Sequence, residues 1–186
     1  PGVDAQTRFN SFSRAKSLVG ALVYRALAEG KLTNLDQTLG ELLPDDRGLA
    51  GVTLRSLLLM RSGIAFDRGE GKAGAVSGDK PVDTSANPFG PLARLHFLGL
   101  GAIEGGLISD TGTAPAFSYQ NVNTALLGEV LETTYQRRLE DLLSEKLWRP
   151  AGATTAAWRQ PAAGSPVSAY CCIYATARDW IRVGQY

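Results

Sequence analysis

The stretch SRAKSLVGALVYRALAEG, residues 13–30, carries the clearest helical pattern of the chain. Its apolar residues recur with the i, i+3, i+4 spacing of a helix that buries one stripe, and Gly30 ends the pattern. Ser13 therefore precedes or opens the first turn, and Lys16 follows one turn later. The apolar positions are Ala15, Leu18, Val19, Leu22, Val23, Ala26 and Leu27.

Ser13 and Lys16 are a candidate pair for nucleophilic chemistry. A serine hydroxyl becomes nucleophilic when a neighbouring base takes its proton, and side chains at i and i+3 of a helix are close enough for that transfer. Lys16 shares its side of the helix with Val23 and Leu27, so we expect its amine to run along apolar surface, where burial favours the neutral form. The same residues also fit a helix N-cap at Ser13 and a solvated lysine, which is the commoner meaning of the motif alone.

Tyr119 and Asn121 directly precede a second periodic run, over residues 124–131. Loops that enter helices commonly present catalytic side chains. A tyrosine beside a lysine can carry protons, and an asparagine can orient a substrate amide with both its donor and its acceptor. Taken alone, the two residues also fit a half-buried aromatic and a helix cap.

Four segments follow one another in an order typical of one group of enzymes. They are Phe12 to Pro44 with Ser13-x-x-Lys16, Val52 to Leu58 followed by Ser62-Gly63, Tyr119-Gln120-Asn121, and Ala175 to Asp179. In this order they resemble the serine β-lactamase and D-alanyl-D-alanine peptidase superfamily, over nearly the whole chain. Met60 and Leu147-Trp148 look similar to its class C-like members, in the branch of 6-aminohexanoate-dimer hydrolase and related esterases.

The resemblance implies an α+β fold, the helix-rich part of the β-lactamase and penicillin-binding fold, in a single domain over residues 1–186. It also implies a serine hydrolase that cleaves an amide or ester bond through an acyl-enzyme intermediate. Ser13 would attack the carbonyl, Lys16 would help to deprotonate it, Tyr119 would shuttle the proton to the leaving group, and Asn121 would hold the substrate. The oxyanion would be bound by the backbone N–H of Ser13 and by a second N–H from a strand far along the chain.

The third motif of the superfamily, a Lys-Thr-Gly or His-x-Gly triplet on a strand, is not found after Asn121. Lys72-Ala73-Gly74 precedes Tyr119 in a Gly-rich stretch, so we interpret it as a loop, like the second Ser-x-x-Lys match at 77–80. The chain also stops at Tyr186 within an apolar-periodic segment. We therefore expect most of the antiparallel sheet to be missing and the chain to be a piece of a longer protein, truncated at both ends, whose remainder is a partner.

Composition fits an ordinary folded domain. The chain has 186 residues, 44% of them hydrophobic, and a net charge of +1, which gives no argument for nucleic acid as a partner. No apolar run approaches the roughly 18 residues of a membrane span. The expected partner is a small-molecule or peptide-like amide or ester, and no cofactor is expected. The resemblance suggests a periplasmic or secreted location, and a cytoplasmic one stays open.

The cysteines and the histidine point to no metal site. Cys171 and Cys172 are adjacent, and adjacent cysteines rarely form a disulfide, so we expect them to be small packing residues rather than catalytic ones. His96 is the only histidine, and no metal-ligand spacing surrounds it.

The pattern predicts helices near 14–29, 53–61, 123–133, 136–148 and 176–185, with Thr176 as the N-cap of the last. Short strands are expected at 7–12 and 170–174, and a long irregular stretch from about 64 to 116, where loop residues crowd. One alternative function stays open: a relative of the same fold that kept Ser13 and Lys16 but acts as a non-catalytic binding or scaffold domain. Another is that Ser13 is only a cap and the resemblance is structural.

Overall fold

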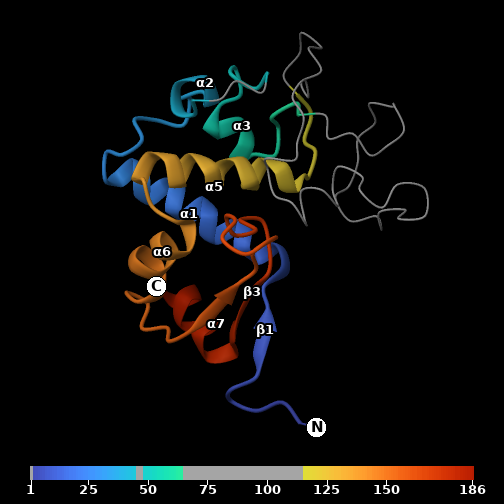
Figure 1. Cartoon of the computed structure of the whole chain (residues 1–186), viewed down its shortest axis with the longest axis vertical. Helices are drawn as coiled ribbons and strands as arrows, with labels where there is room; N and C mark the ends of the chain where they lie inside the picture. Colours follow the sequence, from blue (N-terminus) through green and yellow to red (C-terminus); the bar gives the residue numbers. More distant parts are fainter. Residues whose placement is uncertain (1, 45–47, 65–114) are drawn as a thin grey trace, which may run out of the picture.

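Helices α1 (Ala15–Ala28) and α5 (Asn121–Tyr135) lie at the centre of the computed structural model, which describes residues 2–44, 48–64 and 115–186. The two helices pack against each other (Figure 1). The buried face of α1 includes Val19, Leu22 and Val23, as its apolar spacing predicts. Nine residues of α5 from Val122 to Leu131 are buried, so this helix is covered on most sides.

Two short helices cover one side of α5. They are α2 (Leu39–Leu42) and α3 (Leu54–Leu58), and both contact α5 (Figure 1). A capping box between Thr38 and Glu41 starts α2, and the Thr53 hydroxyl accepts a hydrogen bond from the Ser56 N–H at the start of α3. These caps satisfy backbone groups that such short helices would otherwise leave unpaired.

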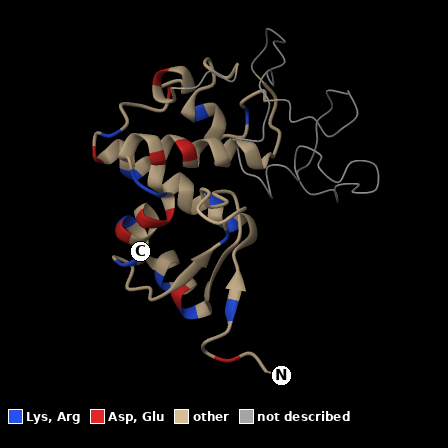
Figure 2. Cartoon of the chain, in the orientation of Figure 1, with Lys and Arg blue, Asp and Glu red and all other residues tan. Residues whose placement is uncertain are grey.

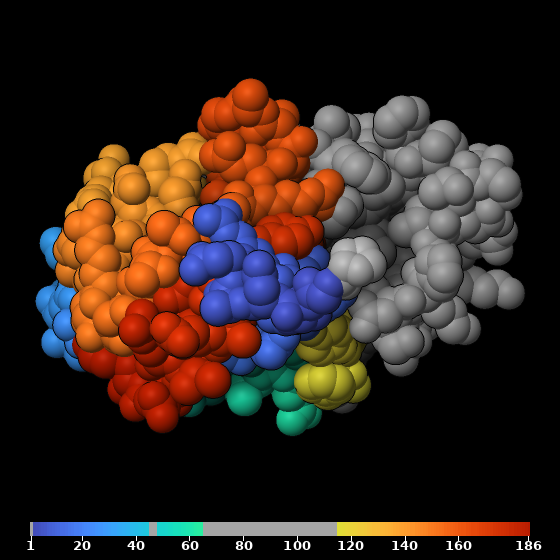
Figure 3. All heavy atoms as spheres, turned by 90° about the horizontal axis from the view of Figure 1, so that it is seen from below, coloured from blue at the N-terminus to red at the C-terminus, as the bar shows by residue number. Residues whose placement is uncertain are grey.

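A three-stranded antiparallel sheet lies next to the N-terminal end of α1. Its strand order is β1-β3-β2. Its strands are β1 (Arg8–Asn10), β2 (Ala156–Trp158) and β3 (Ile173–Thr176). In β1, Phe9 pairs with Ala175 of β3, so strands from the two ends of the described chain lie side by side (Figure 3). This pairing sets the direction in which the chain enters α1.

Of the remaining helical segments, two contact α1 and one contacts β3 of this sheet. Helix α6 (Leu139–Leu143) continues into the π-helical turn η3 (Ser144–Trp148), and α7 (Ala177–Gln185) follows β3 directly. The Trp180 ring on α7 meets the buried Trp148 ring edge to face, with 5.5 Å between centroids. The Arg14 guanidinium lies 5.7 Å from the Trp180 centroid, so α7 also supports the residue that precedes α1.

Acidic and basic residues are interspersed along the helices (Figure 2). One cluster joins three elements: the Glu29 carboxylate accepts hydrogen bonds from the Tyr135 hydroxyl at 2.9 Å and contacts the Lys146 ammonium at 3.2 Å. Burial opposes the ionised form of Glu29, but the bonds from Tyr135, Lys146 and Arg25 outweigh it and lower the pKa of its carboxyl. Burial and the bond to Glu29 raise the pKa of Tyr135 to about 12. The cluster fastens the end of α1 to α5 and η3.

The predicted α+β class is confirmed, and the helices predicted from residue 14 and from residue 176 form within a residue or two of their expected bounds. Thr176 is the N-cap of α7, since its hydroxyl accepts a hydrogen bond from the Asp179 N–H. Helix α3 ends earlier than predicted because Met60 adopts a left-handed φ of 55°, and α6 begins later than predicted because Gln136 does the same at 51°.

The strand predictions were less accurate. The strand expected at 170–174 begins at Ile173, because the preceding residues form a turn in which Cys172 has a φ of 71°. Strand β2 and helix α2 were not predicted. Nearly all of the irregular stretch expected between 64 and 116 lies outside the described residues, as do His96 and the motifs at 72–74 and 77–80.

Gly128 supports a prediction about packing. A Cβ on Gly128 in α5 would lie 2.8 Å from the Ala169 Cβ and 3.2 Å from a Leu139 methyl. Gly128→Ala should therefore lower the free energy of unfolding by about 1–3 kcal/mol, although alanine is the better helix former. Gly20→Ala in α1 is the matched control, because its nearest neighbour would be a Leu58 methyl at 3.8 Å. Gly20→Ala should raise the free energy of unfolding by up to about 1 kcal/mol, and both variants are measured by urea unfolding. An increase in the free energy of unfolding in Gly128→Ala would contradict the packing.

Asp179 supports a prediction about pH. Its carboxylate is buried at 1% exposure and accepts hydrogen bonds from the Thr154 N–H at 2.8 Å and the Thr176 hydroxyl at 2.8 Å. Burial opposes ionisation, but these bonds outweigh it and hold the pKa of Asp179 below its ordinary value of 3.8. The ionised group therefore contributes stability above that value, and this contribution is lost as pH falls through the lowered folded-state pKa.

Asp179→Asn should accordingly lower the free energy of unfolding at pH 7 by about 1–3 kcal/mol. The difference from wild type should shrink as pH falls below 3.8, measured by urea unfolding followed by circular dichroism. Asp36→Asn is the control, because Asp36 forms an exposed ion pair with Arg55 that should matter much less. Equal effects of the two substitutions at pH 7 would show that the buried Asp179 carboxylate does not stabilise the fold as described.

Candidate active site

Ser13 and Lys16 are in direct contact. Ser13 lies in the 3-10 turn η1 (Phe12–Arg14), which runs straight into α1, and Lys16 is the second residue of α1. The Lys16 Nζ lies 2.9 Å from the Ser13 Oγ, within hydrogen-bonding distance. The N-cap position of α1 is held by Arg14, so the interpretation of Ser13 as the cap of this helix is wrong. Both side chains are half-buried.

Lys16 also contacts a second segment, far along the chain. Its Nζ donates a hydrogen bond to the main-chain carbonyl of Tyr170 at 3.0 Å. Burial raises the pKa of the Tyr170 phenol, and the Lys16 Nζ lies 5.7 Å from the centroid of that ring. Sequence reasoning missed this acceptor, because a backbone carbonyl can belong to any residue type and leaves no motif.

The Tyr119 ring lies beside the Lys16 amine. The Lys16 Nζ is 4.9 Å from the centroid of the Tyr119 ring, which is cation–π distance. The turn that carries Tyr119 is fixed from the end of α3: the Ser118 N–H donates to the Met60 carbonyl at 2.8 Å, and the Gln120 amide donates to the Ile64 carbonyl at 3.0 Å. The tyrosine therefore approaches Lys16 from a well-anchored loop.

Asn121 is the first residue of α5, and its side chain is half-buried. Two residues on, the buried Asn123 accepts a hydrogen bond from the Ser62 hydroxyl at 2.5 Å. This bond holds the first turn of α5 against the segment after α3. The structure thus brings Ser13, Lys16 and Tyr119 together, and it places Asn121 at the start of the neighbouring helix.

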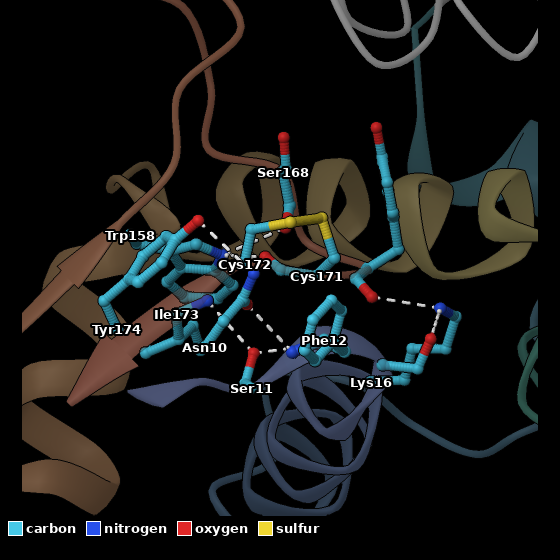
Figure 4. The surroundings of a disulfide bond; sticks show 12 residues. Asn10, Ser11, Phe12, Lys16, Trp158, Ser168, Cys171, Cys172, Ile173 and Tyr174 are labelled. Carbon is cyan, nitrogen blue, oxygen red and sulfur yellow. Dashed lines mark hydrogen bonds between the residues drawn. A yellow bond between two sulfur atoms is a disulfide. The ribbon is translucent and has the colours of Figure 1, made fainter. Parts of the chain in front are cut away.

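The turn before Ser13 is held by residues that the sequence did not single out. The Ser11 Oγ accepts a hydrogen bond from the Ile173 N–H at 3.0 Å, and the Ser11 N–H donates to the Ile173 carbonyl at 2.7 Å (Figure 4). The Asn10 side chain accepts from the Phe12 N–H at 2.9 Å. These bonds hold Phe12 at a φ of 46°, which is rare for a bulky residue. They fix the direction in which Ser13 leaves the sheet.

Cys171 and Cys172 are joined by a disulfide, which corrects the expectation that adjacent cysteines stay unbonded. Their Cα atoms are 3.7 Å apart, the ordinary spacing of neighbours, so the bond closes a small ring within the turn that follows Tyr170. Both residues are buried, with 9% and 8% exposed, as expected of packing residues. Figure 4 shows the bridge close to Ser11, Phe12 and Lys16.

Within the described ranges, no group of three or more His, Cys, Asp or Glu side chains has an arrangement that could hold a metal ion. The same part of the chain contains no helix of the length and apolarity required to cross a bilayer.

Comparison with known proteins agrees with the fold. A family model described as beta-lactamase matches residues 1–185. No match was found among curated proteins. A protein of Bacillus anthracis assigned as a 6-aminohexanoate-dimer hydrolase is 21% identical with a TM-score of 0.72, and the match covers 100% of this chain and 48% of that one.

Two further solved structures are similar. A penicillin binding protein from Bacillus halodurans is 20% identical with a TM-score of 0.69, over 98% of this chain and 60% of that one. The D-alanine carboxypeptidase AmpC from Burkholderia cenocepacia is 20% identical with a TM-score of 0.61, over 97% of this chain and 49% of that one.

The chain thus spans from 48% to 60% of the lengths of these structures. At such identities the likeness shows the fold and does not single out one branch, so the narrower placement beside 6-aminohexanoate-dimer hydrolase stays a prediction. The match over residues 1–185 and the shared fold show that this chain belongs to the beta-lactamase family, within the superfamily of serine β-lactamases and D-alanyl-D-alanine peptidases.

Proposed function

We propose that the protein is a serine hydrolase that cleaves an amide or ester bond through an acyl-enzyme intermediate formed on Ser13. One observation carries the proposal: the Lys16 Nζ lies 2.9 Å from the Ser13 Oγ, with the Tyr119 ring on the same amine. A helix cap or a solvated lysine would not require this geometry. An activated nucleophile does require it, because a base has to lie within hydrogen-bonding reach of the hydroxyl.

The contacts of Lys16 suggest how the proton moves. A neutral amine has one lone pair and two N–H groups. When one N–H donates to the Tyr170 carbonyl, the lone pair can face the Ser13 hydroxyl. As Ser13 attacks a carbonyl carbon, its proton passes to Lys16, and the Tyr170 carbonyl then accepts a stronger bond from the ammonium that forms.

The remaining steps use Tyr119 and Asn121. Tyr119 would return the proton to the leaving group, and a water molecule would then release the acyl group from Ser13 by the reverse sequence of proton transfers. Asn121 would hold the substrate amide or ester with its side-chain amide. The Ser13 N–H, in the first turn of η1, would be one donor to the oxyanion, because the first N–H groups of a helix have no partner within it.

The substrate class follows from the chemistry and agrees with the relatives. Serine acylation suits carbonyls with a leaving group, so we propose a small-molecule or peptide-like amide or ester. The similar structures are named as a dimer hydrolase, a penicillin binding protein and a carboxypeptidase. The alternative, a non-catalytic binding domain of the same fold, differs in one measurable property, which is whether Ser13 becomes acylated.

Covalent labelling tests the nucleophile. Exposure to a fluorophosphonate, a penicillin and a nitrophenyl ester should give a single adduct by intact-mass spectrometry, and peptide mapping should place it on Ser13. Ser13→Ala should abolish the adduct. Ser17→Ala, an exposed serine of the same helix, is the matched control and should keep it. Absence of any adduct on a folded chain would favour the non-catalytic alternative.

The roles of Lys16 and Tyr119 give a second prediction. Lys16→Met should slow fluorophosphonate labelling by about 10²–10⁴-fold and flatten its rise with pH, because no base then takes the Ser13 proton. Tyr119→Phe should slow nitrophenyl ester turnover about 10²-fold while Ser13 can still be labelled. Lys31→Met and Tyr24→Phe, at exposed positions, serve as controls. Unchanged labelling in Lys16→Met would exclude Lys16 as the base.

A further inference from the structure

The Cys171–Cys172 disulfide lies between two contacts with the nucleophile segment. On one side of it, the Tyr170 carbonyl accepts the hydrogen bond from Lys16. On the other side, Ile173 exchanges hydrogen bonds with Ser11 through both its N–H and its carbonyl. The short stretch from 170 to 173 therefore touches the helix that carries Lys16 and the turn that carries Ser13, and the covalent bridge is in its middle (Figure 4).

The backbone of this stretch is held in an uncommon conformation. Cys172 has a φ of 71°, in the left-handed region that residues other than glycine and asparagine seldom occupy. Such conformations persist when the surroundings hold them and concentrate at functional sites. Further restraints come from hydrogen bonds: the Trp158 indole N–H donates to the Cys171 carbonyl at 3.0 Å, and the Arg159 N–H donates to the Cys172 carbonyl at 3.1 Å.

We propose that Cys171 and Cys172 are positioning residues of the active site: their disulfide fixes the Tyr170 carbonyl on Lys16, and its reduction by a dithiol slows the acylation of Ser13. The proposal rests on the function proposed above. In the reduction, two electrons and two protons pass from the dithiol to the bridge. The S–S bond breaks, each cysteine becomes a thiol, and the dithiol becomes a disulfide.

Loss of the bond should matter more than loss of packing. Two thiols fill nearly the same volume as the disulfide, so the buried contacts of both residues are retained. The ring that restrains Cys172 is lost, and its backbone can then leave the left-handed region. Any such movement displaces Tyr170 and Ile173 directly, because each is bonded to one cysteine of the pair.

The experiment compares oxidised and reduced protein. Fluorophosphonate labelling of Ser13 is timed before and after treatment with dithiothreitol, and intact mass verifies the gain of two hydrogen atoms. Since a misplacement of about 1 Å can cost about 10²-fold in rate, we expect labelling to slow by about tenfold to 10²-fold on reduction. The double variant Cys171→Ser/Cys172→Ser should label at the slow rate with and without dithiothreitol.

A pH profile separates positioning from a loss of structure. The Tyr170 carbonyl favours the ammonium form of Lys16, so its departure should move the rise of the labelling rate to lower pH. Tyr119 and Tyr170, whose rings face the Lys16 amine, are monitored by ultraviolet difference spectra so that their ionisation is not mistaken for that of Lys16. A partly unfolded chain would label more slowly at every pH without this shift.

Amide hydrogen exchange tests the structural part of the proposal, and it can be measured even if the protein has no activity. On reduction, exchange should rise in the peptides that contain residues 10–13 and 170–173, and it should stay unchanged in α5. Equal labelling rates and equal exchange before and after verified reduction would overturn the proposal. If the oxidised protein shows no labelling at all, the proposed function fails, and the exchange data alone show whether the disulfide holds the turn.

Discussion

The antiparallel pairing of β1 with β3 is the constraint on which the site depends. It joins Phe9 to Ala175, across most of the chain, and Ser11 continues the pairing with two hydrogen bonds to Ile173. Because α1 begins only a few residues after β1, the pairing fixes the position of Ser13 relative to the segment from 170 to 173. The 2.9 Å contact between Ser13 and Lys16 is local to one helical turn, but the second acceptor of Lys16 exists only because the two distant segments are paired.

Residues in unusual backbone conformations gather around this pairing. Among the described residues, four other than glycine have a positive φ, and three of them adjoin the proposed site: Phe12 before the nucleophile, Cys172 after the Lys16 acceptor, and Met60, whose carbonyl fixes the Tyr119 turn. Each is held by named hydrogen bonds or by the disulfide. Such conformations cost free energy and are retained where the surroundings require a particular backbone direction. The site is therefore built as much from backbone geometry as from reactive side chains.

The sequence predicted the parts of the fold that local patterns determine. The period of apolar residues gave α1 and α7 nearly to the residue, and the cap at Thr176 lies where its sequence signal predicts. The order of motifs gave the superfamily and the candidate residues Ser13, Lys16, Tyr119 and Asn121. Short strands were harder, because three residues such as Ala156–Trp158 have no measurable alternation, and their pairing depends on partners far along the chain. The Tyr170 carbonyl and the bond between Cys171 and Cys172 could not be predicted, since both arise from backbone conformation in a turn.

The long-range strand pairing also determines when the site can form during synthesis. Ser13 and Lys16 leave the ribosome well before residues 173–176, and α1 can form from its own local contacts. The partners of β1 and Ser11 emerge only with residues 173–176, so the nucleophile turn has no template until then. A nascent chain therefore displays the serine and the lysine without the surroundings that orient them until residues 173–176 have been added. The complete constellation forms only after β3 has been synthesised.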